Sequence, residues 1–273
     1  MKLMKYEFRS SARLFLSAYC IFAALLVVDR LSIFGLTVLD NTDLEFAKIL
    51  SAGSVFMLCF LTVLAIFALF CLPLLFSAIR FYRSTATDEG YLTFTLPVKT
   101  EQIIFSKLLV ALIWEAATAL LAIVLGVLFF MSFDVRSTLE VLQLFPESFF
   151  RNISEYPFWG ACFAEFLVAL PLCAAHGILQ SYSAISIGQA CGRHKLLASI
   201  GIYIGMQFAV SFLSQMLTVP VMFASFRSTD TSLRILQDTF FLSMALNLLL
   251  IAGLLVVQFL LCRYFLKKKL NLS

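Results

Sequence analysis

Long uncharged apolar runs, separated by short polar segments, dominate the hydropathy pattern of this chain. Residues 49–79 and 196–226 contain no charged side chain, and four further apolar runs are interrupted by at most two charged residues each. A helix of about 20 residues crosses the roughly 30 Å hydrocarbon core of a bilayer, so each run is long enough to span it. The pattern predicts six membrane-spanning helices, at about residues 14–39, 52–79, 103–131, 158–186, 196–217 and 239–262.

Single residues set two of these boundaries. The first span is expected to run from about Leu14 either to Val28 or past Asp29 and Arg30 to Leu39. Proline lacks a backbone N–H and interrupts helices, so Pro220 is expected to end the fifth span near Leu217 or to start a short re-entrant piece.

Residues 1–13 have the pattern of an amphipathic helix. Four cations (Lys2, Lys5, Arg9 and Arg13) fall within an arc of about 80° on a helical wheel, opposite Leu3, Met4 and Phe8. Such a helix lies in a membrane interface, with its cations in water or near anionic lipid headgroups. The segment is therefore predicted to be an interfacial helix that precedes the first span.

The longest polar connection on the other side covers residues 132–157. Ser137 and Glu140 fit a capping box that opens a short helix, and Pro146 is expected to stop that helix. Two interpretations stay open for this segment. It is either a lid over a transport pathway or a folded loop with no such role.

Composition agrees with a membrane protein. Hydrophobic residues make up 62% of the 273 residues, charged residues only 13%, and there are 30 Phe residues. Globular domains carry about 25% charged residues. The expected fold class is an all-α integral membrane protein that forms a single transmembrane domain over residues 1–273.

The distribution of charge predicts the orientation in the cell membrane. Most of the 20 Lys and Arg residues fall in the terminal segments and around residues 80–107 and 193–195. Cytoplasmic loops carry an excess of Lys and Arg, so both termini and the 80–102 loop are predicted to be cytoplasmic. The 132–157 loop is then extracellular.

Motifs for catalysis and metal binding are missing from the sequence. It contains no G-x-x-x-x-G-K-[ST] phosphate loop, no H-E-x-x-H and no G-x-S-x-G motif. The seven Cys residues form no C-x-x-C pair, and there are only two His residues. We therefore expect no enzymatic activity, metal or cofactor on this chain, and its expected surroundings are membrane lipid rather than nucleic acid.

Two acids lie inside predicted spans, Glu115 in the third and Glu165 in the fourth. A charged side chain at the bilayer centre costs about 2.5–3.5 kcal/mol on insertion scales, so such residues are functional candidates. The alternative is a protonated or paired carboxyl that bridges two helices. The sequence leaves both interpretations open.

The polar island at residues 80–102 carries the most specific pattern in the chain. Its distinctive segments are Arg80-Phe81-Tyr82, Asp88-Glu89-Gly90-Tyr91-Leu92-Thr93, Leu96-Pro97 and Ser106-Lys107-Leu108-Leu109, and the termini contribute Met4 to Phe8 and Tyr264 to Ser273. With these segments the island resembles the cytoplasmic loop that follows the second span in bacterial permease subunits of the type-2 ABC exporter family, and the two termini are similar to Gram-positive members of that group.

The resemblance implies a permease whose transport is driven by a separate cytoplasmic ABC ATPase subunit that binds ATP and Mg²⁺. It also implies a second permease chain, identical or not, and a coupling helix in the 80–102 loop that docks on the ATPase. Thr85 and Asp88 fit the start of that helix, and Thr100 with Glu101 fits the cap of the third span. The coupling residues are expected to be Arg80, Tyr82, Asp88, Glu89, Gly90, Tyr91, Leu92 and Pro97.

Two other functions remain as alternatives. One is a proton-coupled secondary transporter that uses Glu115 or Glu165, and the other is a membrane scaffold or sensor subunit without transport of its own. The transported substrate is not indicated by the sequence, because Phe, Leu, Ser and Gln line many unrelated pathways.

Overall fold

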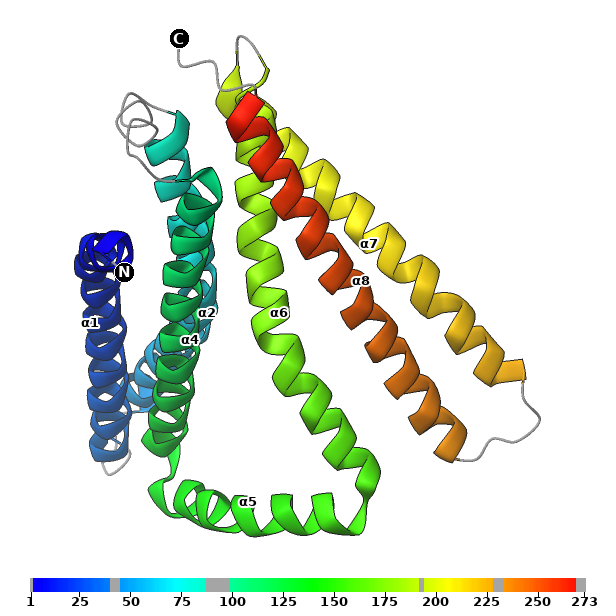
Figure 1. The fold of residues 1–273 in the computed structure, drawn as a ribbon. Coiled ribbons are helices and arrows are strands. Elements are labelled where there is room, and N and C mark those ends of the chain that lie inside the picture. The colour runs from blue at the N-terminus through cyan, green and yellow to red at the C-terminus, as the bar shows by residue number, and fades with distance from the viewer. Residues whose placement is uncertain (1, 40–44, 87–98, 192–193, 228–232, 269–273) are drawn as a thin grey trace. The chain divides into compact units, whose positions relative to one another are not determined.

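The structure is a computed structural model of the 273-residue chain, and it describes residues 2–39, 45–86, 99–191, 194–227 and 233–268. Within these ranges the secondary structure is α-helical, with no strand (Figure 1). The helices are α1 (Lys2–Leu39), α2 (Glu45–Ala86), α4 (Thr100–Phe133), α5 (Val135–Glu155), α6 (Pro157–Gly188), α7 (Lys195–Arg227) and α8 (Leu233–Lys268).

Six of these helices are long and apolar enough to cross a membrane. The segments that meet this condition are Ser11–Gly35, Ala52–Thr85, Thr100–Met131, Phe158–Gly188, Lys195–Ala224 and Gln237–Lys267. Large apolar side chains are widely exposed along them, as expected for surfaces that contact lipid. The prediction of an all-helical, multi-pass membrane protein is confirmed at this level.

The chain divides into two compact units. Unit 1 comprises residues 1–75 and 113–150, and unit 2 comprises residues 76–112 and 151–273. Helices α2 and α4 contribute a part to each unit. In unit 1, a small apolar core brings together Leu26, Leu69, Ala122, Leu125 and Phe129 from α1, α2 and α4.

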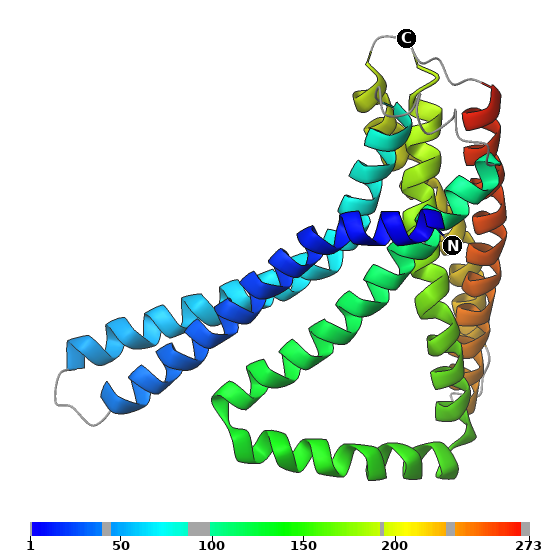
Figure 2. The same ribbon diagram turned by 60° about the vertical axis from the view of Figure 1, so that its left-hand side comes forward.

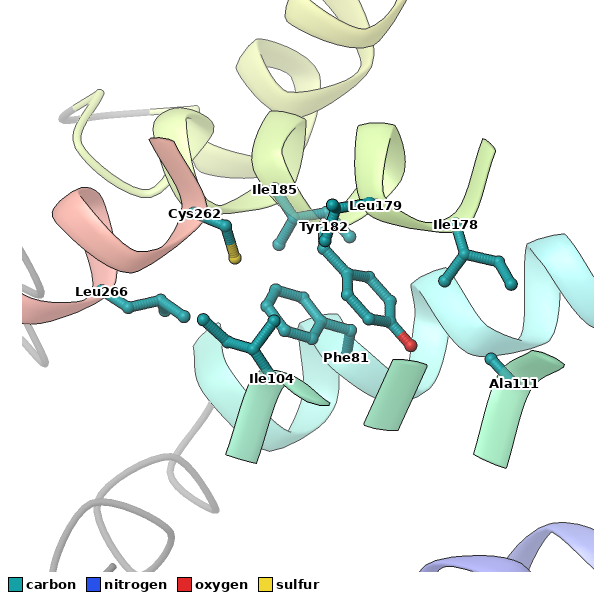
Figure 3. Packing of buried hydrophobic residues seen from close by; sticks show 9 residues of the cluster. All are labelled: Phe81, Ile104, Ala111, Ile178, Leu179, Tyr182, Ile185, Cys262 and Leu266. Atoms are coloured by element: carbon teal, nitrogen blue, oxygen red, sulfur yellow. The ribbon is translucent and has the colours of Figure 1, made fainter. Parts of the chain in front are cut away.

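Unit 2 contains the larger core. Helix α6 packs against both α7 and α8, and α7 packs against α8. The last turns of α2 and the first half of α4 complete this core (Figure 3). We call its nine side chains the anchor cluster, which consists of Phe81, Ile104, Ala111, Ile178, Leu179, Tyr182, Ile185, Cys262 and Leu266.

The first predicted segment is part of a longer helix. Residues 2–13 form the first turns of α1, which continues without interruption to Leu39 and bends near its start (Figure 2). No separate helix precedes the first span in this described part of the chain. Placement of these turns in a membrane interface stays a prediction.

Pro220 does not end the fifth span, contrary to expectation. Helix α7 continues through it to Arg227. Six residues before the proline, Ser214 donates a hydrogen bond of 2.5 Å to the Asn247 side chain on α8, whose amide donates to Thr218 at 3.0 Å. This polar clasp links α7 to α8 close to Pro220, and membrane-spanning helices tolerate proline where neighbouring helices support them.

The 132–157 connection is also more helical than expected. Helix α5 runs through Pro146, and Asp134 rather than Ser137 caps its start. The Asp134 carboxylate accepts hydrogen bonds from the backbone N–H of Arg136 at 2.9 Å and from the hydroxyl of Ser137 at 2.5 Å. The predicted capping box is therefore wrong by one turn, since an Asp at N-cap competes effectively with Ser.

Candidate functional site

The polar island begins as the last turns of α2. Residues 80–86 contain neither Gly nor Pro, so nothing in the sequence ends the helix there. Phe81 is fully buried (0% exposed), and its ring stacks on Tyr182 of α6 with centroids 4.1 Å apart and an interplanar angle of 10° (Figure 3). The end of α2 is thereby fixed to α6 by an aromatic contact.

A buried hydrogen bond adds to this contact one turn later. The Thr85 hydroxyl donates to the backbone carbonyl of Phe81 at 2.6 Å and accepts a hydrogen bond of 3.2 Å from the amide of Gln189. Both side chains are buried, so the pair is shielded from competing water. The sequence context had suggested that Thr85 starts a new helix. In the structure Thr85 lies inside α2, which runs to Ala86.

Helix α4 begins on the other side of the island. The carbonyl of Lys99 accepts hydrogen bonds from the backbone N–H of Gln102 at 2.9 Å and of Ile103 at 3.3 Å, which closes the first turn. Ile103 and Ile104 are buried, and Ile104 belongs to the anchor cluster. The expected cap is thus displaced by one residue, because Thr100 is already helical.

Helix α8 is tied to the same region. Cys262 and Leu266 are buried in the anchor cluster, and the Cys262 sulfur lies 3.3 Å from the Ser186 hydroxyl on α6. Arg263 and Glu101 form an ion pair of 2.9 Å between α8 and the first turn of α4. Both helix ends that flank residues 87–98 are therefore packed on α6 and α8.

The predicted coupling residues fall into two groups. Arg80 and Tyr82 are half-buried on the last turns of α2, and Tyr82 packs against the anchor cluster. The remaining coupling candidates, Asp88, Glu89, Gly90, Tyr91, Leu92 and Pro97, lie outside the described residues.

The turn from α6 to α7 shows a close approach of two backbones. A Cβ on Gly188 would lie 2.7 Å from both the Cα and the backbone nitrogen of Ser199. Such distances do not occur between real side chains and backbone, so only Gly fits at this position. The turn itself is closed by the backbone hydrogen bond of 3.1 Å from Cys191 to Gly188.

Unit 1 holds Glu115 beside an aromatic stack. The Trp114 ring is parallel to both Phe8 and Phe15 of α1, with centroid distances of 4.8 and 4.5 Å. Phe8 and Phe15 are two helical turns apart, about 10 Å along the axis, so the indole lies between the two rings. The Tyr19 hydroxyl bonds Thr118 at 2.7 Å one turn further on.

Each intramembrane acid leaves one carboxylate oxygen unpaired. Oε2 of Glu115 and Oε2 of Glu165 are buried and have no hydrogen-bond partner among the described residues. Glu115 belongs to unit 1 and Glu165 to unit 2. They are therefore two separate features rather than one carboxylate pair.

Sequence reasoning missed a third acid, Asp29. It is buried in unit 1, and its carboxylate accepts a short hydrogen bond from the Thr62 hydroxyl on α2. The neighbouring Arg30 donates to the backbone carbonyl of Met131 at 3.2 Å. The signal was present, because Asp29 interrupts an apolar run that continues beyond it, but it was interpreted as a possible end of the span.

A second missed feature is a set of amide side chains in unit 2. Gln180 of α6 donates to Gln207 of α7 at 3.0 Å, which links two spans by a polar contact. Gln258 of α8 is buried and faces His176 of α6, but the pair lies outside hydrogen-bonding geometry. Glutamines inside apolar runs are the sequence signal that marks these contacts.

Comparisons of the chain with known protein families, with curated proteins and with solved structures find no match.

Proposed function

We propose that this chain is the permease subunit of an ABC exporter, which provides the membrane pathway while a separate cytoplasmic subunit binds and hydrolyses ATP. The proposal rests on the resemblance of residues 80–109 to type-2 exporter permeases and on the six helices of membrane-spanning length. The single observation that carries it furthest is the anchor cluster, which holds both helix ends around residues 87–98.

The anchor cluster supplies a route for mechanical coupling. A partner that pulls on residues 87–98 acts on the end of α2 and the start of α4. Phe81 and Ile104 are both buried against α6 and α8, so a displacement of either end must move those helices as well. Close-packed cores of this kind transmit displacement because they are poorly compressible.

Loss of the docking contacts should uncouple the subunits without unfolding the permease. We expect a Tyr91→Ala, Leu92→Ala double variant to insert normally but to lose copurifying ATPase, because buried aromatic and aliphatic anchors dominate small interfaces. The measurement is mass spectrometry of proteins that copurify with the tagged permease in mild detergent, together with substrate-stimulated ATP hydrolysis.

A matched control separates docking from general damage. Tyr156 and Leu167 are the same residue types and are exposed; Tyr156 directly precedes α6, and Leu167 lies in the half of α6 that is remote from Gly188. The Tyr156→Ala, Leu167→Ala variant should retain the ATPase. Equal copurification of ATPase with both double variants would refute the assignment of residues 87–98.

The unpaired carboxylate oxygens favour one second candidate, a proton-coupled transporter. In that case Glu115 or Glu165 would carry the proton, and transport would follow the proton gradient without ATP. Glu115→Gln keeps the shape and hydrogen-bonding capacity of the side chain but removes the ionisable proton. Transport that requires ATP and is unchanged in Glu115→Gln and Glu165→Gln would exclude this candidate.

A further inference from the structure

Helix α5 is joined to two membrane-spanning helices with almost no linker. Only Asp134 separates it from α4, and only Tyr156 separates it from α6 (Figure 1). Since α4 and α6 both cross the membrane, chain connectivity places the two ends of α5 at the same membrane face. Its 21 residues span about 31 Å at 1.5 Å per residue, so α5 runs along that face.

The side chains of α5 separate into two faces. At 100° per residue, seven apolar side chains fall within an arc of about 140°, and the two other aliphatic residues, Val141 and Leu144, lie outside it. This apolar face consists of Val135, Leu139, Leu142, Phe145, Phe149, Phe150 and Ile153. The five charged residues, Arg136, Glu140, Glu147, Arg151 and Glu155, lie within an arc of about 100° on the other side of the helix.

The apolar face is largely uncovered. Phe145 is 62% exposed and Phe150 is 69% exposed, and both Leu139 and Leu142 are exposed as well. The rings of Phe145 and Phe149 stack on each other with centroids 5.6 Å apart. A contiguous apolar strip of this kind needs an occupant other than water.

Charge and position identify that occupant. Two Arg residues stand against three Glu residues in α5, and Arg136 is paired with Glu140 at 3.3 Å, so the polar face offers little attraction to anionic groups. Burial of apolar surface must therefore provide most of the free energy of binding. Directly after α5, Tyr156 and Trp159 are exposed, and such aromatic residues gather at the level of the lipid headgroups.

Pro146 limits how deep the helix can lie. Proline has no N–H, so the carbonyl of Leu142 cannot receive its usual helical hydrogen bond. An unsatisfied carbonyl is costly in hydrocarbon but is easily hydrated at the headgroup level. The helix is suited to the boundary between headgroups and acyl chains and not to the bilayer core.

We propose that α5 is an interfacial helix that binds the lipid bilayer through its apolar face, at the membrane face where α4 ends and α6 begins. This proposal requires only the membrane-spanning architecture and does not depend on the permease assignment.

Spin labels on the reconstituted full-length protein test the proposal. A ketone amino acid introduced at single positions carries the label and leaves the native Cys residues in place. Labels at positions 142, 145 and 149 in neutral phosphatidylcholine vesicles should be accessible to dissolved oxygen and protected from an aqueous nickel complex. Labels at 140, 147 and 151 should show the reverse, and the pattern should not change with salt.

The other outcomes overturn the proposal. High accessibility of all six positions to the nickel complex would mean a solvated loop. Protection of positions 142, 145 and 149 from both reagents would mean that protein covers the face, either as a lid over this chain or as a partner. A Phe145→Glu variant should raise nickel accessibility at position 149 several-fold, whereas Leu144→Glu, the same kind of change on the charged side of the helix, should leave it unchanged.

Discussion

Phe81 connects the end of α2 to the rest of unit 2 through a stacked ring contact with Tyr182 of α6. Its side chain is fully buried against Tyr182, whereas Phe67, four turns earlier, is 69% exposed. Two phenylalanines of one helix therefore have different roles. Their hydropathy is identical, and only the packing distinguishes them.

We expect Phe81→Ala to lower the free energy of unfolding by about 3–5 kcal/mol, because truncation of a buried aromatic removes its contacts and leaves a cavity. Thermal unfolding in detergent measures the loss. Phe67→Ala is the matched control and should have a small effect. An equal loss in both variants would mean that the anchor cluster does not stabilise unit 2.

We expect Gly188→Ala to destabilise the packing of α6 on α7. The added methyl group would meet the backbone of Ser199, which cannot move aside as a flexible side chain can. Gly253→Ala is the control, since no atom lies within 4 Å of the corresponding Cβ on α8. The midpoint temperature of thermal unfolding should fall only in Gly188→Ala. In Gly253→Ala the new side chain meets no other atom, and the helix gains up to about 1 kcal/mol of propensity.

At the scale of elements, helix α5 depends on its first turn. The hydroxyl of Ser137 and the backbone N–H groups of Ser137 and Arg136 bond the Asp134 carboxylate and lower its pKa. A carboxyl with a lowered pKa in the folded state stabilises that state above its unfolded value of about 3.9. The stabilisation is lost as the pH falls through the lowered value.

We therefore expect the start of α5 to become mobile as the pH is lowered below about 4. The mobility of a spin label at position 139 in the reconstituted protein measures this change between pH 6 and pH 3. In Asp134→Asn the side chain still caps the helix but does not titrate, so the label mobility should be constant. The same pH dependence in the native protein and in Asp134→Asn would mean that a group other than Asp134 titrates.

The elements themselves were predictable because each depends on its own stretch of sequence. An uncharged apolar run of about 20 residues has no alternative to a helix in a bilayer, so the six spans followed from the runs alone. The prediction for Pro220 was wrong because it considered α7 alone. The Asn247 side chain that bonds α7 close to the proline belongs to α8. Asp134 was missed because it was assigned to the loop rather than to the first turn of α5.

The site was less predictable than the elements. The sequence pattern identified residues 80–102 as a candidate site. The burial of Phe81 and Thr85, however, depends on Tyr182 and Gln189, which lie about a hundred residues away in the sequence. Local sequence contains no information on such pairs. Asp29 could have been recognised, because an acid inside an apolar run needs a partner such as Thr62.

At the scale of the whole molecule, the distribution of cations predicts that both termini face the cytoplasm. Single-Cys variants in a Cys-free background test this. An impermeant maleimide added to intact cells should label Gln143→Cys, and it should leave Gly90→Cys and Lys268→Cys unmodified. Labelling with the opposite pattern would mean that the topology is inverted. Residues 87–98 would then face away from a cytoplasmic ATPase.

The proposed permease is also expected to work as part of a larger assembly. Six helices rarely enclose a pathway, so we expect two permease chains with two ATPase chains, the second permease being identical or a related chain. Native mass spectrometry of the complex purified in mild detergent gives the stoichiometry. A single permease chain that transports substrate with its ATPase would contradict this expectation.

The indole of Trp114, held between Phe8 and Phe15, fixes how far α1 can slide along α4. Seven residues of helix, about 10 Å along the axis, separate the two rings, and the indole centroid lies 4.8 Å from that of Phe8 and 4.5 Å from that of Phe15. An axial shift by a single turn would unstack both rings, and one inserted residue would rotate one ring away by about 100°. The stack therefore fixes the axial register of α1 on α4. We expect α1 to move together with this part of α4.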